Sequence, residues 1–379
     1  MKKAIVLSCF YQDIATSRPK TVSDYLKTHY EVEVLTADFC HSTKSYNTDN
    51  VENVVKIHVP PYKTNMSLRR IFSHVVYAFK IRSYIKKNVP DLLYVCVPPN
   101  LAGFLAVKMG KKKGSKCVVD VIDIWPNYNM TGKGVRGAFE RIWATFRHEA
   151  VKSADIVILE CRLYRSFLGM ERERVHVVPL AKKAPQLEIG ERETDPGRNN
   201  LYVCYLGAFS DSYDFFSMTY ILAHLSKWHL HLDIIGYGER KEEVLEELKK
   251  NEIRYTDHGV VYDEDKKRKI LAKCHLGYNG FVGKAIVGLS YKSIDYLSYG
   301  VPLLNSVKGD TWEVVESDQI GFNFSDSKLE TVIRDIDRLS YEEFSEMKKR
   351  ARKTFENNFE WNVYCNKMNI LLSEIGEIE

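Results

Sequence analysis

The stretch "GLSYKSIDYLSYGVPLL", residues 288–304, predicts a short helix that runs directly into an apolar strand. The Gly-Val-Pro at 300–302 ends the helix, because glycine accepts the left-handed backbone that closes a helix and proline cannot continue one. Unpaired N–H groups at a helix start carry partial positive charge, so a Gly-Ser loop with Lys292 suits a phosphate. Asp295, one turn later, repels a phosphate but accepts hydrogen bonds from sugar hydroxyls. The stretch therefore indicates a ligand that carries both groups, as a nucleotide does.

Length and composition indicate a folded protein of two domains. At 379 residues the chain exceeds the size at which one hydrophobic core keeps growing, and its apolar and charged fractions, 45% and 28%, are those of a globular protein. Residues 1–14 hold only a short apolar run without a cleavage site, and no stretch reaches the ~18 apolar residues of a membrane span. The eight cysteines stand singly, with no Cys-x-x-Cys pair and no histidine at metal-binding spacing. We therefore expect buried free thiols in a reducing cytoplasm, and no signal peptide, membrane helix or metal site.

Charge is distributed unevenly along the chain. Residues 1–180 carry 28 Lys and Arg against 16 Asp and Glu, a balance of +12, whereas residues 181–379 carry 27 against 34, a balance of −7. This asymmetry indicates that the N-terminal half alone meets an anionic surface, either a nucleic acid or a membrane. A nucleic-acid binder has little support, because the chain lacks a stacking or helix-turn-helix motif.

Short apolar runs alternate with amphipathic stretches almost throughout, which is typical of βα units around a parallel sheet. We expect strands at 4–10, 31–37, 54–60, 91–98, 116–124, 155–160 and 175–180, and again at 201–207, 231–238, 257–261, 275–281, 301–307 and 321–324. The polar stretch 181–200, with Pro, Gly and charges, interrupts this alternation.

The predicted fold class is α/β, with two doubly wound Rossmann-like domains. They cover residues 1–180 and 201–358, joined by a linker at 181–200, and a C-terminal helix at 359–379 returns to the first domain. Neither half carries GxGxxG at its first strand–helix turn, nor GxxxxGK[ST], so dinucleotide dehydrogenases and P-loop NTPases are disfavoured. Ligands of such folds bind beyond the carboxyl ends of the strands, so we expect the two domains to face a central cleft.

The order of these pieces resembles the two-Rossmann-domain glycosyltransferases of the GT-B type, group 1 or family 4. The resemblance covers nearly the whole chain and rests on four landmarks: the Gly loop "YLGAFSDSYDF" (205–215), the Gly-x-Gly of "IIGYGERKEEVLEEL" (234–248), the stretch 258–281 that passes the base, and a helix of the "PxKxxEYxAxGxPV" kind at 290–302. The last landmark is the most specific.

The resemblance implies that the second domain grips a nucleotide sugar. Backbone N–H groups from Leu289 to Lys292 would hold the diphosphate together with the Lys292 cation, and Asp295 matches the family's ribose-binding carboxylate, one methylene shorter. The donor-binding candidates are Gly207, Gly236, Gly238, Val261, Ser290, Tyr291, Lys292 and Asp295. The alternative is that Lys292 and Asp295 form an exposed ion pair on a capped helix.

The chain departs from the family pattern at two places. The turn "AFSDSYD" after the second domain's first strand lacks the Arg and Lys that many members have there, and Val287 stands at the first Glu of the ExxxxxxxE pattern. Lys284 or Arg240 could replace the missing cations, although hydrated surface is the simpler interpretation of each. These departures leave open what clamps the phosphates and what contacts the transferred sugar.

The first domain supplies the acceptor side in this interpretation. "FYQDIATSRPKTVSDYL" (10–26) resembles the family's first turn without its usual glycines, so Ser17 and Arg18 are expected to bind the acceptor. "DVIDIWP" (120–126) ends the fifth strand with wording similar to that of the family, and Asp123 is the predicted catalytic residue beside the transferred sugar. The alternative is that Asp123 is a turn aspartate that caps the next helix.

Two basic stretches, 67–87 and 108–116, indicate contact with anionic lipid. In the first, an apolar stripe recurs at helical spacing and the cations lie largely off it; the stripe consists of Leu68, Ile71, Phe72, Val75 and Phe79. This pattern fits either an interfacial helix on a membrane or a packed helix with a hydrated basic face.

Taken together, the residues and the resemblance predict a hexosyltransferase that extends a polyprenyl-linked saccharide during bacterial capsule, O-antigen or exopolysaccharide assembly. The resemblance implies retention of anomeric configuration, a UDP- or GDP-sugar as co-substrate, and no metal or other cofactor. The expected location is cytoplasmic, at the inner face of the cell membrane. The alternative is a catalytically impaired GT-B scaffold that acts as a binding or assembly partner, which the missing Arg-Lys pair and the missing Glu favour.

Overall fold

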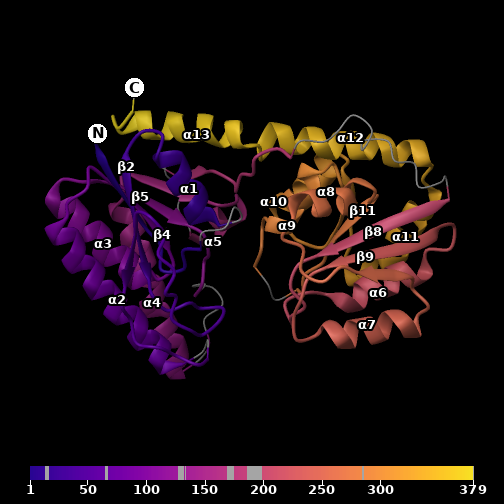
Figure 1. The fold of residues 1–379 in the computed structure, drawn as a ribbon, viewed down its shortest axis with the longest axis horizontal. Coiled ribbons are helices and arrows are strands. Elements are labelled where there is room, and N and C mark those ends of the chain that lie inside the picture. Colours follow the sequence, from indigo (N-terminus) through magenta and orange to yellow (C-terminus); the bar gives the residue numbers. More distant parts are fainter. Residues whose placement is uncertain are drawn as a thin grey trace. The chain divides into compact units, whose positions relative to one another are not determined.

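Two compact units make up the chain in the computed structural model, which describes residues 1–12, 17–64, 67–126, 132, 134–168, 175–185, 199–283 and 286–378. The first unit contains Met1–Pro179 and Cys365–Glu379, and the second contains Leu180–Tyr364. Each is a parallel sheet with helices on both faces (Figure 1).

The first unit is built on a seven-stranded sheet with the order β3-β2-β1-β4-β5-β6-β7. Its elements are β1 (Lys3–Leu7), α1 (Arg18–Leu26), β2 (Glu31–Ala37), β3 (Val54–Ile57), α2 (Leu68–Lys87), β4 (Leu92–Val97), α3 (Asn100–Lys113), β5 (Lys116–Val121), α4 (Gly134–Ser153), β6 (Ile156–Leu159), α5 (Leu163–Leu168) and β7 (Val175–Val177). The chain moves outward in opposite directions from β1 and β4, so right-handed crossovers place α1 and α3 on opposite faces. Tyr25 on α1 donates a hydrogen bond to Asn369 (2.6 Å), which ties the end of α13 (Trp361–Glu374) to this unit.

The second unit has a six-stranded sheet with the order β10-β9-β8-β11-β12-β13. Its elements are β8 (Asn200–Leu206), α6 (Phe215–His224), β9 (His229–Ile235), α7 (Lys241–Lys250), β10 (Tyr255–Asp257), α8 (Glu264–Ala272), β11 (Leu276–Asn279), α9 (Tyr291–Ser298), β12 (Leu303–Asn305), α10 (Asp310–Ser317), β13 (Gly321–Asn323), the 3₁₀ turn η3 (Asp326–Lys328), α11 (Leu329–Arg338) and α12 (Tyr341–Asn358). The direction of winding reverses between β8 and β11, as it does between β1 and β4.

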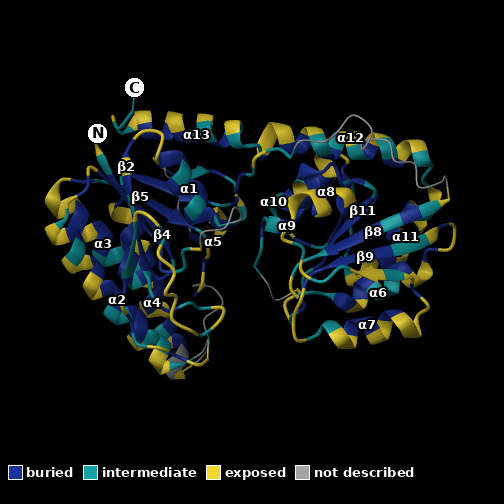
Figure 2. Ribbon diagram, in the orientation of Figure 1, coloured by how far each residue is buried: buried dark blue, intermediate teal, exposed yellow. Residues whose placement is uncertain are grey.

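Both sheets are buried on two faces, which is why their strands read as continuous apolar runs. All six residues of β4 are buried, and Figure 2 shows the strands dark while the outer faces of the helices are exposed. Glycines on α3 allow the helix to press against this strand: a Cβ at Gly103 would lie 2.4 Å from Cγ1 of Val97, and one at Gly110 would lie 2.8 Å from Cδ2 of Leu93. Close packing of helix on sheet thus fixes the edge of the sheet where ligands bind.

The predicted α/β class with two doubly wound sheets is confirmed. Each predicted strand has an observed counterpart, mostly a shorter one, although the stretch predicted at 257–261 meets β10 only at Asp257. Residues 186–198 of the predicted linker lie outside the described residues. The start of that linker packs on the second unit, because Lys182 N donates to Phe359 O (2.9 Å) and Trp361 N donates to Lys182 O (3.1 Å). The expectation of a central cleft stays a prediction.

Helix α2 packs on the sheet through a different face from its apolar stripe. The residues buried on α2 are Ser73, His74, Tyr77, Ala78, Ile81 and Ile85. Within the stripe, Leu68, Phe72 and Phe79 are exposed, with 84%, 59% and 54% of their surface accessible, whereas Ile71 and Val75 are partly buried, so the stripe is not part of the core. Three large apolar side chains with helical spacing are therefore available on the outer surface of the first unit.

Two further predictions concern the cysteines, expected to be buried free thiols, and the helices, none of which was expected to cross a membrane. All eight cysteines are free, and six of them are buried, whereas Cys40 and Cys365 are half-buried. In the part of the chain that the structure describes, no helix combines the length and the apolar character that a membrane crossing requires.

Candidate donor and acceptor sites

The carboxyl edge of the second sheet brings together two loops that leave in opposite directions. Because the winding reverses between β8 and β11, the carboxyl ends of these two strands form the kind of switch point at which doubly wound folds bind ligands. The loop after β8 contains Gly207 to Asp214, and the loop after β11 leads to Ser290 at the start of α9. Residues 284–285 of the second loop, including the candidate cation Lys284, lie outside the described residues.

Helix α9 is held against the sheet at both of its ends. Ser290 caps the N-terminus, its Oγ accepting from Ser293 N (3.2 Å). Gly300 adopts the left-handed conformation (φ 69°), and Val301 N donates to Tyr296 O (2.9 Å), which forms the Schellman closure that the Gly-Val-Pro sequence predicts. Leu206 N donates to the Tyr296 hydroxyl (2.7 Å), which fixes the helix to the end of β8.

An asparagine ladder positions the start of α9, and sequence reasoning missed it. Asn279, Asn305 and Asn323 pair in register at the ends of β11, β12 and β13. Ser290 Oγ donates to Asn279 Oδ1 (2.7 Å), Asn279 Nδ2 donates to Asn305 Oδ1 (2.8 Å), and Asn305 Nδ2 donates to Asn323 Oδ1 (2.7 Å). Asn323 in turn donates to the Trp312 carbonyl (2.9 Å). The signal was available in the sequence, since each of these three short strands ends in Asn.

Lys292 is a buried cation with no counter-ion among the residues that the structure describes. Only 6% of the residue is exposed, and its Nζ has no hydrogen-bond partner in the structure. It lies over the rings of Tyr213 (3.7 Å to the centroid), Tyr205 (4.6 Å) and Phe281 (5.3 Å). Burial lowers the pKa of Lys292 to about 7, with a small opposing effect from Cys204. The alternative interpretation, an exposed ion pair with Asp295, is therefore wrong.

The predicted glycines bring the loops after β8 and β9 into contact. A Cβ at Gly236 would lie 1.9 Å from Gly207 O, and a Cβ at Gly238 would lie 2.3 Å from Phe209 O, so no side chain fits at either position. Gly207 N donates to Ile235 O (2.9 Å), which extends the pairing of the strands into the loops. Gly207 also lies next to Lys292, since a Cβ there would be 3.2 Å from Nζ. The structure thus gathers Gly207, Lys292 and the start of α9 at one place.

Asp295 is buried and already paired. Lys182 Nζ donates to its Oδ1 at 2.5 Å and lies over the ring of Tyr299 (5.0 Å). The carboxylate keeps a second oxygen for a ribose hydroxyl, so the pair is compatible with the predicted role, which stays a prediction. Lys182 was not anticipated, because it lies 113 residues away in the stretch expected to be a linker.

The other donor candidates lie around this edge in different settings. Val261 packs against the apolar cluster under α9 and is only partly buried. Tyr291, the first residue of α9, is half-buried. Arg240 pairs with Glu243 (2.6 Å) and approaches Asp211 (3.6 Å) at the surface, as the simpler interpretation predicts. Two exposed aromatic residues at the same edge were missed: Tyr237, which lies between the two glycines, and Tyr262.

In the first unit, Arg18 is buried rather than open to solvent. Pro19 occupies the first turn of α1, and Ser17 precedes the helix without making a side-chain cap. Arg18 Nε donates to Asp120 Oδ2 (2.7 Å), which also accepts from the Tyr94 hydroxyl (2.6 Å). Both terminal nitrogens of the Arg18 guanidinium are buried and have no hydrogen-bond partner among the described residues.

Asp123 is an exposed turn residue at the end of β5. Its Oδ1 accepts from Trp125 N (2.8 Å), and Arg147 holds the same turn through the carbonyls of Ile124 (2.6 Å) and Pro126 (3.2 Å). Surrounding protein atoms desolvate the carboxyl and raise the pKa of Asp123, against the effects of Trp125 N–H and Arg147. Asp123 therefore accepts the hydrogen bond expected of a turn aspartate, and its predicted catalytic role stays a prediction.

Glu160 is a second carboxyl group at this edge, and sequence reasoning missed it. It follows β6, the neighbour of β5, where Val121 pairs with Leu159. Burial raises the pKa of Glu160 to about 7, opposed by Arg18 and reinforced by Asp120 and Asp123. A glutamate directly after the apolar strand "IVIL" was the available signal. Arg18, Asp120, Asp123 and Glu160 therefore interact electrostatically at one end of the first sheet.

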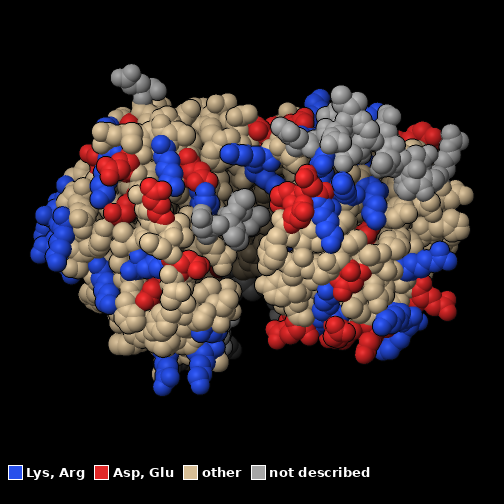
Figure 3. Space-filling view, in the orientation of Figure 1, with Lys and Arg blue, Asp and Glu red and all other residues tan. Residues whose placement is uncertain are grey.

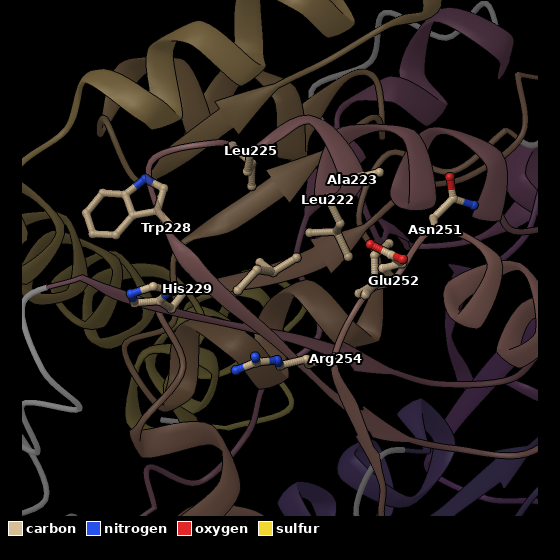
Figure 4. Close-up of a pocket in the computed structure, with 10 residues that line it drawn as sticks. Leu222, Ala223, Leu225, Trp228, His229, Asn251, Glu252 and Arg254 are labelled. Carbon is tan, nitrogen blue, oxygen red and sulfur yellow. The ribbon is translucent and has the colours of Figure 1, made fainter.

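Two cavities lie away from these positions. The first, of about 230 Å³, is at the opposite end of the second sheet, near the start of β9, where Trp228, His229 and Arg254 point around its rim (Figure 4). The second, of about 360 Å³, lies between α1 and the start of β3 in the first unit and is lined by Lys20, Ser23 and Lys27 among others. Within the described ranges, no group of three or more His, Cys, Asp and Glu residues could hold a metal ion.

Comparison with known proteins shows which family model and which solved structures this chain resembles. Residues 21–181 match the model of the glycosyl transferase 4-like domain. Among solved structures, sucrose-phosphate synthase from Thermosynechococcus elongatus is 12% identical with a TM-score of 0.73, and covers 99% of both chains. Anabaena HepE, in complex with UDP and glucose, is 14% identical with a TM-score of 0.69 and covers 98% of this chain and all of that one.

WaaG, a glycosyltransferase involved in lipopolysaccharide biosynthesis, is 14% identical with a TM-score of 0.69 and covers 97% and 99% of the two chains. No curated protein sequence matches the chain. At these identities the solved structures establish the fold over both units, and the domain model identifies the first half. The chain therefore has the GT-B fold, as the resemblance to group 1 glycosyltransferases predicts, and its residues 21–181 are similar to the glycosyl transferase 4-like domain.

Proposed function

We propose that the protein is a glycosyltransferase that binds a nucleotide sugar on its second unit, at the start of α9. The observation that carries this proposal is Lys292, a buried cation with no hydrogen-bond partner beside the N-terminus of a helix. A diphosphate would supply the missing anion and accept hydrogen bonds from the free N–H groups of the helix. The HepE structures, which hold UDP and UDP-glucose on the same fold, support a UDP- or GDP-sugar as the co-substrate.

The proposed reaction is transfer of a hexosyl group with retention of configuration. The bond between the sugar and the diphosphate breaks as an acceptor oxygen bonds to the sugar, and negative charge grows on the departing nucleoside diphosphate. Fixed amide dipoles and the Lys292 ammonium would stabilise that charge in place of a metal ion. Transfer should accordingly persist in the presence of EDTA.

The acceptor that we propose is a polyprenyl-diphosphate-linked saccharide of a bacterial capsule, O-antigen or exopolysaccharide, bound by the first unit. Its positive balance favours an anionic partner. Arg18, with two unpaired guanidinium nitrogens, could donate to a phosphate or sugar oxygen, and Asp123 and Glu160 could orient the attacking hydroxyl.

We further propose that the protein works at the cytoplasmic face of the cell membrane. The exposed stripe of Leu68, Phe72 and Phe79 would enter the lipid interface, while the neighbouring basic residues would contact anionic headgroups. Basic side chains are visible on the outer edge of the first unit, whereas acidic ones gather over α7 of the second (Figure 3).

The test is a thermal-shift panel of UDP-, GDP- and CMP-sugars, followed by a transfer assay with lipid-linked saccharides. A ligand that binds only the folded state raises the melting temperature, so one nucleotide class should stand out. The rival function is a binding scaffold without catalysis, which is favoured by the absent Arg-Lys clamp and by the pairing of Asp295 with Lys182. Slow hydrolysis of the sugar nucleotide without acceptor would exclude the scaffold, and a complete absence of nucleotide binding would exclude the enzyme.

A further inference from the structure

Three rings surround Lys292. Tyr205 lies on β8, and Tyr213 and Phe281 belong to two loops that are joined to each other. Tyr213 and Phe281 form an isolated antiparallel bridge, in which Val282 N donates to Ser212 O (3.1 Å). Asp214 N donates to Gly280 O (3.3 Å), so the loops after β8 and β11 close together over the lysine. We call Tyr205, Tyr213 and Phe281 the aromatic cage.

The aromatic cage gives the amine no anionic partner. Ring faces attract an ammonium, but they do not replace the hydration that burial removes. The titratable groups beside Lys292 are Cys204, which has a charge effect on the pKa of the lysine, and the ring residues Tyr205 and Tyr213. The pKa of each of the three is raised, so all three stay neutral near pH 7. On its own helix the nearest carboxylate in sequence, Asp295, is taken by Lys182. The amine is therefore poised between its neutral and charged forms.

The aromatic cage includes a residue from the turn in which this chain departs from the family pattern. Tyr213 comes from the turn in which many relatives have an Arg and a Lys, and Arg240, the described candidate for replacing them, is paired with Glu243. Among the described residues, the candidate phosphate site therefore has one unpaired lysine, Lys292.

We propose that the aromatic cage holds Lys292 largely neutral in the free protein at slightly alkaline pH, and that entry of a nucleoside diphosphate sugar draws one proton from solvent onto Nζ. No covalent bond changes: the amine gains the proton, and the resulting ammonium pairs with a diphosphate oxygen. This inference rests on the proposed function. It adds that donor binding is coupled to pH and that Tyr213 is a positioning residue for Lys292.

The test is isothermal titration of the full-length protein with UDP-glucose, or with GDP-mannose if the thermal-shift panel selects guanine. Such diphosphate diesters carry no phosphate monoester that titrates near neutrality. Titrations in pairs of buffers whose ionisation enthalpies differ, Tris and HEPES at pH 8 and Bis-Tris and MES at pH 6, give the number of protons taken up. A group with a pKa of about 7 predicts about 0.9 proton per site at pH 8 and about 0.1 at pH 6.

Three variants separate the cage from general effects. Lys292→Arg should bind the donor without proton uptake, because a guanidinium is charged at either pH. Tyr213→Phe should keep the uptake, whereas Tyr213→Ala should admit water and reduce it at pH 8 while the donor still binds. Donor binding with equal, buffer-independent heats in the wild type would overturn the inference and leave the proposed function standing. Failure of every nucleotide sugar to bind would overturn both.

Discussion

Lys292 shows how a group that lowers stability can be kept for binding. Its pKa in the folded protein lies below its ordinary value of 10.5, so the unfolded chain binds more protons than the folded chain between about pH 7 and 10.5. The free energy of unfolding therefore rises with pH through that window. The folded amine is neutral there, and the cost of removing its proton on folding falls as the pH approaches 10.5. Below pH 7 both states are charged and the cost is constant.

Replacing this lysine should separate binding from stability. Lys292→Met removes a charge-assisted hydrogen bond to the diphosphate, so the donor dissociation constant should rise roughly 10- to 150-fold, which corresponds to about 1.5–3 kcal/mol. Stability at pH 7 should not fall, because the methionine buries no charge. Lys250→Met, at an exposed residue paired with Glu247 on α7, is the matched control and should bind as the wild type does. Unchanged donor affinity in Lys292→Met would contradict the assigned site.

Glu160 predicts a pH dependence of opposite origin. Its folded pKa of about 7 exceeds the ordinary 4.5, so the folded chain binds more protons between these values and loses stability as pH rises from about 4.5 to 7. Glu160→Gln removes this loss, so urea unfolding should show the variant gaining on the order of 1–3 kcal/mol relative to the wild type between pH 5 and pH 8. Equal differences at the two pH values would mean that Glu160 titrates normally.

At the scale of elements, the asparagine ladder connects three strand ends to the first turn of the donor helix. Asn305→Ala removes the partner of Asn279 Nδ2 and of Asn323 Oδ1, at about 1–3 kcal/mol per unpaired group, and weakens the support of Ser290. We expect lower stability in urea and weaker donor binding at temperatures where the variant remains folded. Asn358→Ala, an exposed position with a single bond to Thr354 O, is the control. A stability loss with wild-type donor affinity would make the ladder purely structural.

Helix α2 predicts membrane binding through residues that contribute little to the fold. The double variant Phe72→Ser and Phe79→Ser should melt within about 1 °C of the wild type, since exposed side chains rarely change stability by more than about 0.5 kcal/mol. It should float poorly with anionic liposomes, whereas Phe216→Ser, an equally exposed change on α6 of the second unit, should float as the wild type does. Recovery that is independent of salt and equal with neutral vesicles would show that charge does not drive the contact.

At the scale of the whole molecule, the proposed roles are divided between two units. The donor residues lie in the second unit, and Asp123 lies in the first. Asp123→Ala should therefore leave donor affinity unchanged within about twofold, yet lose most of the transfer rate, because its effect arises only as charge develops on the sugar. Folding should be normal, since the hydrogen bond that Asp123 accepts from Trp125 N lies in an exposed turn. Transfer near the wild-type rate would make Asp123 a turn residue only, with Arg18 and Glu160 the next candidates.

Particular residues show how far local patterns reach. The Schellman end of α9 and the closely packed glycines at 236 and 238 follow from the sequence, because a proline, a glycine and their neighbours dictate backbone geometry within a few residues. The sequence left two interpretations of the apolar stripe of α2 open, because periodicity marks one face of a helix without saying what covers it. Here Tyr77, Ala78 and Ile81 pack on the sheet instead.

The sequence by itself determined the α/β class with two doubly wound sheets, the succession of the thirteen described strands along the chain and the position of the helix that precedes Gly300, because these depend on hydrophobic period and on helix and turn chemistry that act locally. Only the tertiary structure decided which charges meet. The Lys182–Asp295 pair, the Arg18–Asp120 pair, the asparagine ladder and the aromatic cage join residues that are distant in sequence, and their burial sets the pKa values. Desolvation and pairing depend on three-dimensional proximity, which no local pattern contains.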